Sequence, residues 1–334
     1  MFRPFSTTGI GSFPHLDADE ASGLVLRGFD IPFWPQLPKV SFLESMIPQF
    51  SEGMPFVRIN RERETIIVRR DESDELERFY EGYQEESRIS MSEDYARVFY
   101  SYLRAVRTRH FGALKGQITG PLTFTLGLKD SEGRLLYFDE ELRQISLMLL
   151  QAKARWQIDQ LKHFADEVII FIDEPILSAI GSTAYLGVSA EETLRLLKET
   201  ADAIKGSGGI PGIHCCGNAD WPLVIESGIQ ILNFDAYNYF DNFLIFHEEV
   251  TKFLEGGGYL AWGIIPTTDE IEKESPETII DVFQERLDAL SRHVPRNTLL
   301  SRSLLTPSCG AGSRSISEAI KVLQLLIRLK EEFS

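Results

Sequence analysis

Three side chains that favour soft metal ions stand out in the sequence. His214 and Cys216 are one residue apart in a short apolar run, and Cys309 lies before Gly310 near the other end of the chain. Because side chains alternate along a strand, His214 and Cys216 should share one face and Cys215 should point the opposite way. Imidazole and thiolate groups are preferred zinc ligands. The spacing therefore predicts a Zn²⁺ site formed by His214, Cys216 and Cys309.

The fourth position at this zinc is open between Asp235, a water molecule and the sulfur of a substrate. Asp235 ends another apolar run and could instead bind substrate. Two thiolates cancel the charge of the metal, which makes it a weak activator of water but still able to hold an incoming thiol as a nucleophilic thiolate. The ligand set thus favours alkyl transfer to sulfur over hydrolysis. The alternative is that all these residues are buried strand residues without a chemical role.

Two further segments carry polar groups at the ends of apolar runs. Asp173 and Glu174 occur in the segment IDEP at 172–175, and a carboxylate there could accept an ammonium group or could be a salt-bridged acid. Ser12 lies in IGSFP at 10–14, where its hydroxyl could hold a carboxylate. These residues predict a substrate site beside the zinc, with Asp173 as the residue that anchors the reacting molecule.

Short apolar runs alternate with helical patterns along the whole chain. Eight runs are expected to be strands: 7–13, 31–37, 114–120, 168–174, 212–216, 229–235, 259–265 and 300–307. Most are continuously apolar, as expected of parallel strands covered on both faces. Eight such units predict a (β/α)8 TIM barrel with the polar groups at the carboxyl ends of its strands. A doubly wound open sheet is the alternative, but no GxGxxG follows any strand.

Helical periodicity fills the longer intervals between these strands. Helices are predicted at 136–165, 191–205, 276–293 and 316–333, the last three preceded by the capping serines Ser189, Ser275 and Ser315. The region 41–110 is too long for one crossover and contains a hairpin-like piece at 56–69 and a charged helical segment at 71–109. We expect this region to be an insertion after the second strand that covers the barrel mouth, within a single domain spanning 1–334.

Composition restricts the classes of function. The chain has 334 residues, 43% of them hydrophobic, which is enough for one large core. A net charge of −16 without a basic stripe argues against nucleic acid. No apolar run is long enough for a membrane span, and residues 1–6 lack the apolar core of a signal peptide, so we expect a cytoplasmic protein. Three cysteines, two of them adjacent, argue against a disulfide framework.

Together these motifs resemble the catalytic barrel of cobalamin-independent methionine synthase, and most closely the short proteins grouped with it and with uroporphyrinogen decarboxylase. The segments 10–14, 172–175, 214–216 and 307–310 occur in family order across nearly the whole chain. The resemblance implies a zinc-activated homocysteine thiol that attacks a methyl donor. It places zinc on the predicted histidine and two cysteines, and homocysteine against Ser12 and Asp173.

The sequence departs from the family in three places. The family has a glutamate as zinc ligand after the sixth strand, and Asp235 is the nearest carboxylate here. Glu44 is the nearest candidate for the family's second substrate glutamate. We expect no counterpart of the second, folate-binding barrel of the full-length enzyme, so the donor is open between a methyl-folate, a methyl-corrinoid protein and a simpler methylated compound. A uroporphyrinogen decarboxylase-like enzyme and a non-catalytic zinc- or thiol-binding module are the competing functions.

Overall fold

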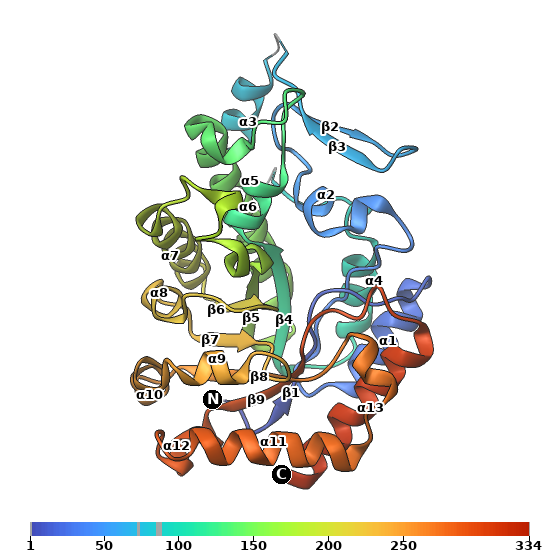
Figure 1. The fold of residues 1–334 in the computed structure, drawn as a ribbon. Coiled ribbons are helices and arrows are strands. Elements are labelled where there is room, and N and C mark those ends of the chain that lie inside the picture. The colour runs from blue at the N-terminus through green and yellow to red at the C-terminus, as the bar shows by residue number, and fades with distance from the viewer. Residues whose placement is uncertain (1, 72–73, 85–88, 334) are drawn as a thin grey trace.

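A curled parallel sheet of seven strands forms the centre of the fold (Figure 1). The computed structural model describes residues 2–71, 74–84 and 89–333. The strands follow the order β1-β9-β8-β7-β6-β5-β4, and all neighbours are parallel. They are β1 (Ser6–Thr7), β4 (Phe111–Thr119), β5 (Ala165–Asp173), β6 (Ile210–Cys215), β7 (Ile231–Phe234), β8 (Tyr259–Ile265) and β9 (Ser303–Pro307). The predicted α/β class is confirmed, with the sheet forming a half-barrel consistent with a TIM-like barrel.

The expected strand at 31–37 does not form in the described part of the chain, which leaves seven strands in the sheet instead of eight. This segment makes one isolated bridge toward each edge of the sheet, from Gln36 to Ser12 and from Phe33 to Lys115. Two of its seven residues are prolines, which have no N–H to donate to a ladder. Apolar character therefore predicted the place of the segment correctly but not its hydrogen bonding.

Helices cover the outer face of the sheet (Figure 1). The main ones are α1 (Ala18–Gly28), α5 (Pro121–Gly127), α6 (Glu140–Leu161), α7 (Ala190–Gly206), α8 (Trp221–Glu226), α9 (Phe240–Leu244), α10 (His247–Glu255), α11 (Pro276–Leu290), α12 (Arg296–Ser301) and α13 (Ile316–Phe333). The predicted capping serines are confirmed: Ser189, Ser275 and Ser315 each accept a hydrogen bond from the backbone three residues on. The helix expected at 136–165 begins with a 3₁₀ turn (Leu136–Phe138) before α6.

The insertion after the segment 31–37 contains the predicted hairpin. Strands β2 (Val57–Asn60) and β3 (Thr65–Val68) pair antiparallel, beyond α5 in Figure 1. The charged stretch 71–109 forms two helices, α3 (Glu75–Gln84) and α4 (Arg97–Val106), instead of one segment, and its residues 72–73 and 85–88 lie outside the described residues. The short elements η1 (Phe42–Glu44) and α2 (Met46–Phe50) precede the hairpin.

Alternation along the strands divides the core into two clusters. On β5, Ile169 and Phe171 belong to the cluster inside the curl of the sheet, whereas Ile170 and Ile172 belong to the cluster beneath the helices. The same alternation places Asp173 on the inner side, at the carboxyl end of its strand. Across the described residues, no helix combines the length and apolar character needed to cross a membrane.

Candidate metal centre

The structure brings His214, Cys216 and Cys309 together. One ligand atom from each lies within 4.8 Å of the other two. His214 is the fifth residue of β6, Cys216 follows the end of that strand, and Cys309 lies two residues beyond the end of β9. Cys215 belongs to the helix-facing core, as the alternation predicted. The three residues predicted as zinc ligands therefore form one cluster at the carboxyl ends of their strands.

The imidazole of His214 fits a metal ligand. Its Nδ1 is hydrogen-bonded to Oδ1 of Asn233, while its buried Nε2 has no partner in the part of the chain that the structure describes. An unpaired buried ring nitrogen is costly unless something else binds it. An imidazole held through Nδ1, with its other nitrogen unpaired and two cysteine sulfurs nearby, matches the donor set and outer-shell support of zinc sites.

The pKa values of the two thiols are shifted in opposite directions by their contact. The hydrogen bond from Cys309, together with the nearby His214, lowers the pKa of Cys216 to about 4. The thiolate of Cys216 and burial in turn raise the pKa of Cys309 well above its ordinary value. Burial lowers the pKa of His214, but the Cys216 thiolate, Asp173 and Asn233 together outweigh burial, so the net shift is upward. The cluster is a strong site for positive charge, which a divalent cation would satisfy.

A cavity of about 90 Å³ opens directly onto this cluster. Its walls are Ile10, Gly11, Ser12, Gln36, Met46, Asp173, Pro175, His214, Cys216, Cys309 and Gly310. Met46 comes from α2, so the insertion contributes a wall, as expected of a segment that covers the mouth. Gln36 was not predicted as a site residue, although its signal was present: it is a polar residue at the end of an apolar run, as Ser12 and Asp173 are.

The loop that carries Cys309 is fastened to Ser12. Ala311 donates its N–H to the carbonyl of Ser12 at 2.7 Å, and Gly312 donates to Oγ of Ser12 at 3.2 Å. A Cβ at Gly310 would lie 2.8 Å from the Ser12 backbone nitrogen, so glycine is needed for this close approach. Ser12, whose hydroxyl was predicted to bind substrate, therefore also fixes the loop that carries Cys309, one of the predicted metal ligands.

Asp173 ends β5 at the wall of the cavity. It is 3% exposed, and its Oδ1 has no partner among the described residues. Burial raises the pKa of Asp173, against the effect of His214 and Lys115. Lys115 of β4 is fully buried between the rings of Phe33, at 5.1 Å, and Phe171, at 4.4 Å. This lysine was not predicted as a residue near the site, because the sequence of an apolar run does not show which face of the sheet the lysine side chain lies on.

Glu174 takes part in a structural contact instead of lining the cavity. Its carboxylate accepts hydrogen bonds from the N–H of Leu122 at 2.8 Å, the N–H of Thr123 at 2.8 Å and the hydroxyl of Thr123 at 2.6 Å. It thereby holds the first turn of α5. A role for Glu174 in binding substrate stays a prediction, and no contact in the structure supports it.

Asp235 and Glu44 also lie outside the cluster and the cavity wall. Asp235 accepts hydrogen bonds from the backbone N–H of Asn238 at 2.9 Å and from its side-chain amide at 2.8 Å. Glu44 is buried and accepts from the N–H of Leu37 at 3.1 Å. The structure thus brings three of the four predicted zinc ligands together and leaves Asp235 as a ligand untested.

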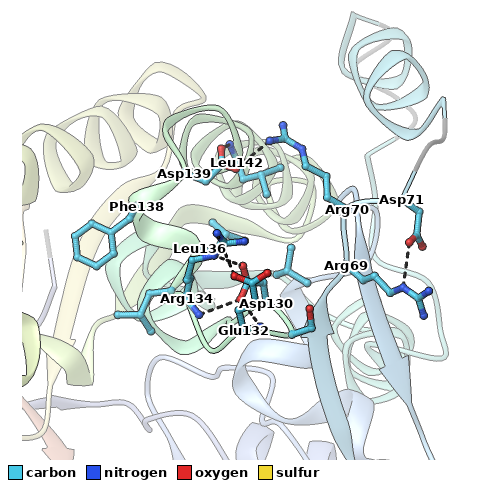
Figure 2. Close-up of a pocket in the computed structure, with 13 residues that line it drawn as sticks. Arg69, Arg70, Asp71, Asp130, Glu132, Arg134, Leu136, Phe138, Asp139 and Leu142 are labelled. Carbon is cyan, nitrogen blue, oxygen red and sulfur yellow. Dashed lines mark hydrogen bonds and ion pairs between the residues drawn. The ribbon is translucent and has the colours of Figure 1, made fainter.

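A larger cavity of about 730 Å³ lies away from the cysteines, between β3 and the start of α6 (Figure 2). Its three guanidinium groups are already paired with carboxylates: Arg69 with Asp71 at 3.0 Å, Arg70 with Asp139 at 3.1 Å and Arg134 with Asp130 at 2.7 Å. No cysteine or histidine lines it. Of these two cavities, the smaller one therefore holds the cysteines and the histidine.

Comparison with solved structures supports the fold. A B12-independent methionine synthase from Shewanella sp. W3-18-1, determined with selenomethionine, matches 98% of this chain and 97% of its own with a TM-score of 0.59 and 16% identity. An amidohydrolase (15% identity, 68% and 65% coverage) and a putative fructose-1,6-biphosphate aldolase from Coccidioides immitis (13%, 69% and 82%) match with TM-scores of 0.29 and 0.28, too low to carry an argument. No protein-family profile and no curated protein matches the sequence.

Proposed function

We propose that this protein is a cytoplasmic zinc-dependent methyltransferase that transfers a methyl group to the thiol of homocysteine, giving methionine. The observation that carries the proposal is the joint position of His214, Cys216 and Cys309 at a small cavity lined by Ser12 and Asp173. The full-length match to a methionine synthase supports it at the level of the fold. We also infer that residues 31–37 close the sheet into a TIM-like barrel within a single domain.

His214, Cys216 and Cys309 would hold the zinc. When bound, zinc would keep the substrate thiol as a thiolate near neutral pH. Two negatively charged sulfur ligands leave that thiolate nucleophilic, because they reduce the charge of the site. Asp235 remains the candidate for a fourth ligand, as an alternative to water or the substrate sulfur.

The remaining residues of the cavity orient the substrate. Asp173 would accept hydrogen bonds from the substrate ammonium, and the hydroxyl of Ser12 would donate to its carboxylate. The sulfur then forms a bond to the methyl carbon while the bond from that carbon to the donor breaks, and the donor leaves with the electron pair. A homocysteine side chain bound here would displace water from the cavity.

A methyl-corrinoid protein, a methyl-folate and a simple methylated compound all fit the reaction. The cavity wall contains no arginine or lysine, which disfavours the polycarboxylate substrate of a uroporphyrinogen decarboxylase-like enzyme. We therefore retain methyl transfer as the proposal and treat thiol binding without turnover as an outcome of the test.

The decisive experiment incubates zinc-loaded protein and homocysteine with each donor and detects methionine by mass spectrometry. We expect methionine with at least one donor, and loss of both zinc and product in Cys309→Ser. Cys215→Ser is the matched control and should retain both. Methionine formation by protein without zinc would overturn the proposal, and tight homocysteine binding without product from any donor would indicate a binding module.

A second experiment tests the role of Asp173. Asp173→Asn should raise the KM for homocysteine about tenfold or more, because a hydrogen bond between charged groups contributes about 1.5–3 kcal/mol. The zinc content should not change, since Asp173 is not among the clustered ligands. An unchanged KM would show that the substrate ammonium binds elsewhere.

A further inference from the structure

We propose that Asn233 is a positioning residue that prepares His214 to bind the metal and connects the strands that carry the histidine and the second cysteine. The inference rests on the zinc site of the proposed function. Asn233 is fully buried in the middle of β7, within the apolar sequence ILNF, and pairs in register with His214 of β6. A buried amide at this place needs partners for each of its polar atoms.

The hydrogen bonds of Asn233 fix the orientation of its amide. Its Nδ2 donates to the carbonyl of Ala261 at 2.8 Å and to the hydroxyl of Thr306 at 2.8 Å. A carbonyl oxygen can only accept, so the amide nitrogen must face Ala261 and the amide oxygen must face His214. Both N–H groups of the amide are then occupied by β8 and β9.

This orientation selects one form of the imidazole. Because Oδ1 of Asn233 can only accept, Nδ1 of His214 must carry the hydrogen in the bond between them. The neutral ring then has its lone pair on Nε2, the nitrogen that has no partner among the described residues. Only a nitrogen with a free lone pair can bind a metal. Asn233 thus holds the ring and its tautomer ready for the ion.

The same side chain reaches across four strands. In the sheet order β9-β8-β7-β6, the two ligand-bearing strands are separated by β7 and β8. Asn233 contacts His214 on one side and, on the other, Thr306, three residues before Cys309. A single amide therefore connects the two parts of the chain that must meet to hold the metal. We expect this connection to bring the site close to its metal-bound geometry before the ion arrives.

The test measures zinc affinity by competition with a chromophoric chelator, and the ligand set by the absorption of bound Co²⁺. Asn233→Leu has a similar size but no acceptor for His214, and we expect zinc to bind about 10–100-fold more weakly. Asn233→Asp keeps the acceptor and should bind zinc within a few-fold of wild type. It should nevertheless melt at a lower temperature, because a carboxylate cannot donate to the carbonyl of Ala261. Thr306→Val should show a smaller loss of affinity than Asn233→Leu.

Each outcome decides a different question. Wild-type zinc affinity and an unchanged Co²⁺ spectrum in Asn233→Leu would overturn the positioning role. Equal weakening in Asn233→Asp and Asn233→Leu would overturn it as well, because the retained acceptor would then have no effect. If Asn233→Leu does not fold, the test is the zinc affinity of Asn233→Asp compared with that of Thr306→Val. A wild-type protein that binds no zinc would instead refute the proposed function, before any variant is compared.

Discussion

Cys215 and Cys216 are neighbours in the sequence, but their thiols have very different pKa values because they point in opposite directions. Burial in the helix-facing core raises the pKa of the Cys215 thiol to about 12. The hydrogen bond from Cys309 and the imidazole of His214 lower the pKa of Cys216 to about 4. The two residues have the same side chain but point in opposite directions, into different surroundings. Their reactivity should therefore differ by orders of magnitude near neutral pH.

We predict that iodoacetamide modifies Cys216 of the metal-free protein at pH 6, while Cys215 stays unmodified. Only the thiolate reacts with iodoacetamide. A pH of 6 is above the pKa of the Cys216 thiol but far below the pKa of the Cys215 thiol, so only Cys216 is a thiolate. Peptide mass spectrometry after timed labelling measures both sites in one sample. Zinc should protect Cys216, and Cys215→Ser should label at the wild-type rate. Labelling of Cys215 at a rate similar to that of Cys216 would contradict the assignment of faces.

At the scale of elements, the sequence predicted those features that depend only on neighbouring residues, such as helix starts and the faces of strand residues. The serines before α7, α11 and α13 marked helix starts because a cap needs only neighbouring backbone. Alternation placed His214 and Cys216 on one face for the same reason. The segment 31–37 was assigned as a strand because its apolar side chains fit one, yet strand formation also requires N–H groups that its prolines lack.

The supporting residues of the site could not be predicted, because their roles depend on partners from other strands. Asn233 is informative only once His214, Ala261 and Thr306 are known to surround it. Glu174 was expected at the substrate, and its contact with α5 became visible only in the folded chain. The reactive groups of this site follow from residue type and spacing, whereas the groups that hold them follow from the tertiary structure.

The contact of Glu174 with α5 predicts that the protein is less stable when this carboxylate is removed. Glu174→Ala removes an acceptor that satisfies two backbone N–H groups at the start of α5, and we expect it to lower the free energy of unfolding by about 2–4 kcal/mol. Glu174→Gln retains one acceptor oxygen and should lower the free energy of unfolding by a smaller amount. Urea unfolding followed by circular dichroism measures both variants. A larger loss in Glu174→Gln than in Glu174→Ala would contradict this account.

At the scale of the whole molecule, a buried lysine is expected to lower the free energy of unfolding. Lys153 of α6 is fully buried, its Nζ has no partner within the described ranges, and burial lowers its pKa from 10.5 to about 7. The unfolded chain therefore binds more protons than the folded chain between about pH 7 and 10.5. The contribution of this residue to the free energy of unfolding should rise with pH across that window.

We predict that Lys153→Met raises the free energy of unfolding at pH 7 by about 1–3 kcal/mol, because methionine has a similar shape and no charge to desolvate. The gain should shrink at pH 9.5, where the folded wild-type lysine is already neutral and the unfolded one is approaching its own pKa. Urea unfolding at both pH values measures the effect. Lys198→Met, at an exposed position of α7, is the control and should show neither change. A gain for Lys153→Met that does not depend on pH would indicate packing alone.

Zinc should stabilise the entire fold, because its ligands come together only when the sheet is complete. Cys216 and Cys309 are far apart in the chain and are carried by strands that do not adjoin, so the unfolded protein has no comparable site. Binding to the folded state alone raises the free energy of unfolding by about 4 kcal/mol when free zinc exceeds its Kd a thousandfold. Differential scanning calorimetry with and without a chelator should show a Tm several degrees higher with zinc. Cys215→Ser should keep this shift and Cys309→Ser should lose it. An equal shift in both variants would mean that zinc stabilises the protein from another place, and that the three clustered ligands do not form its site.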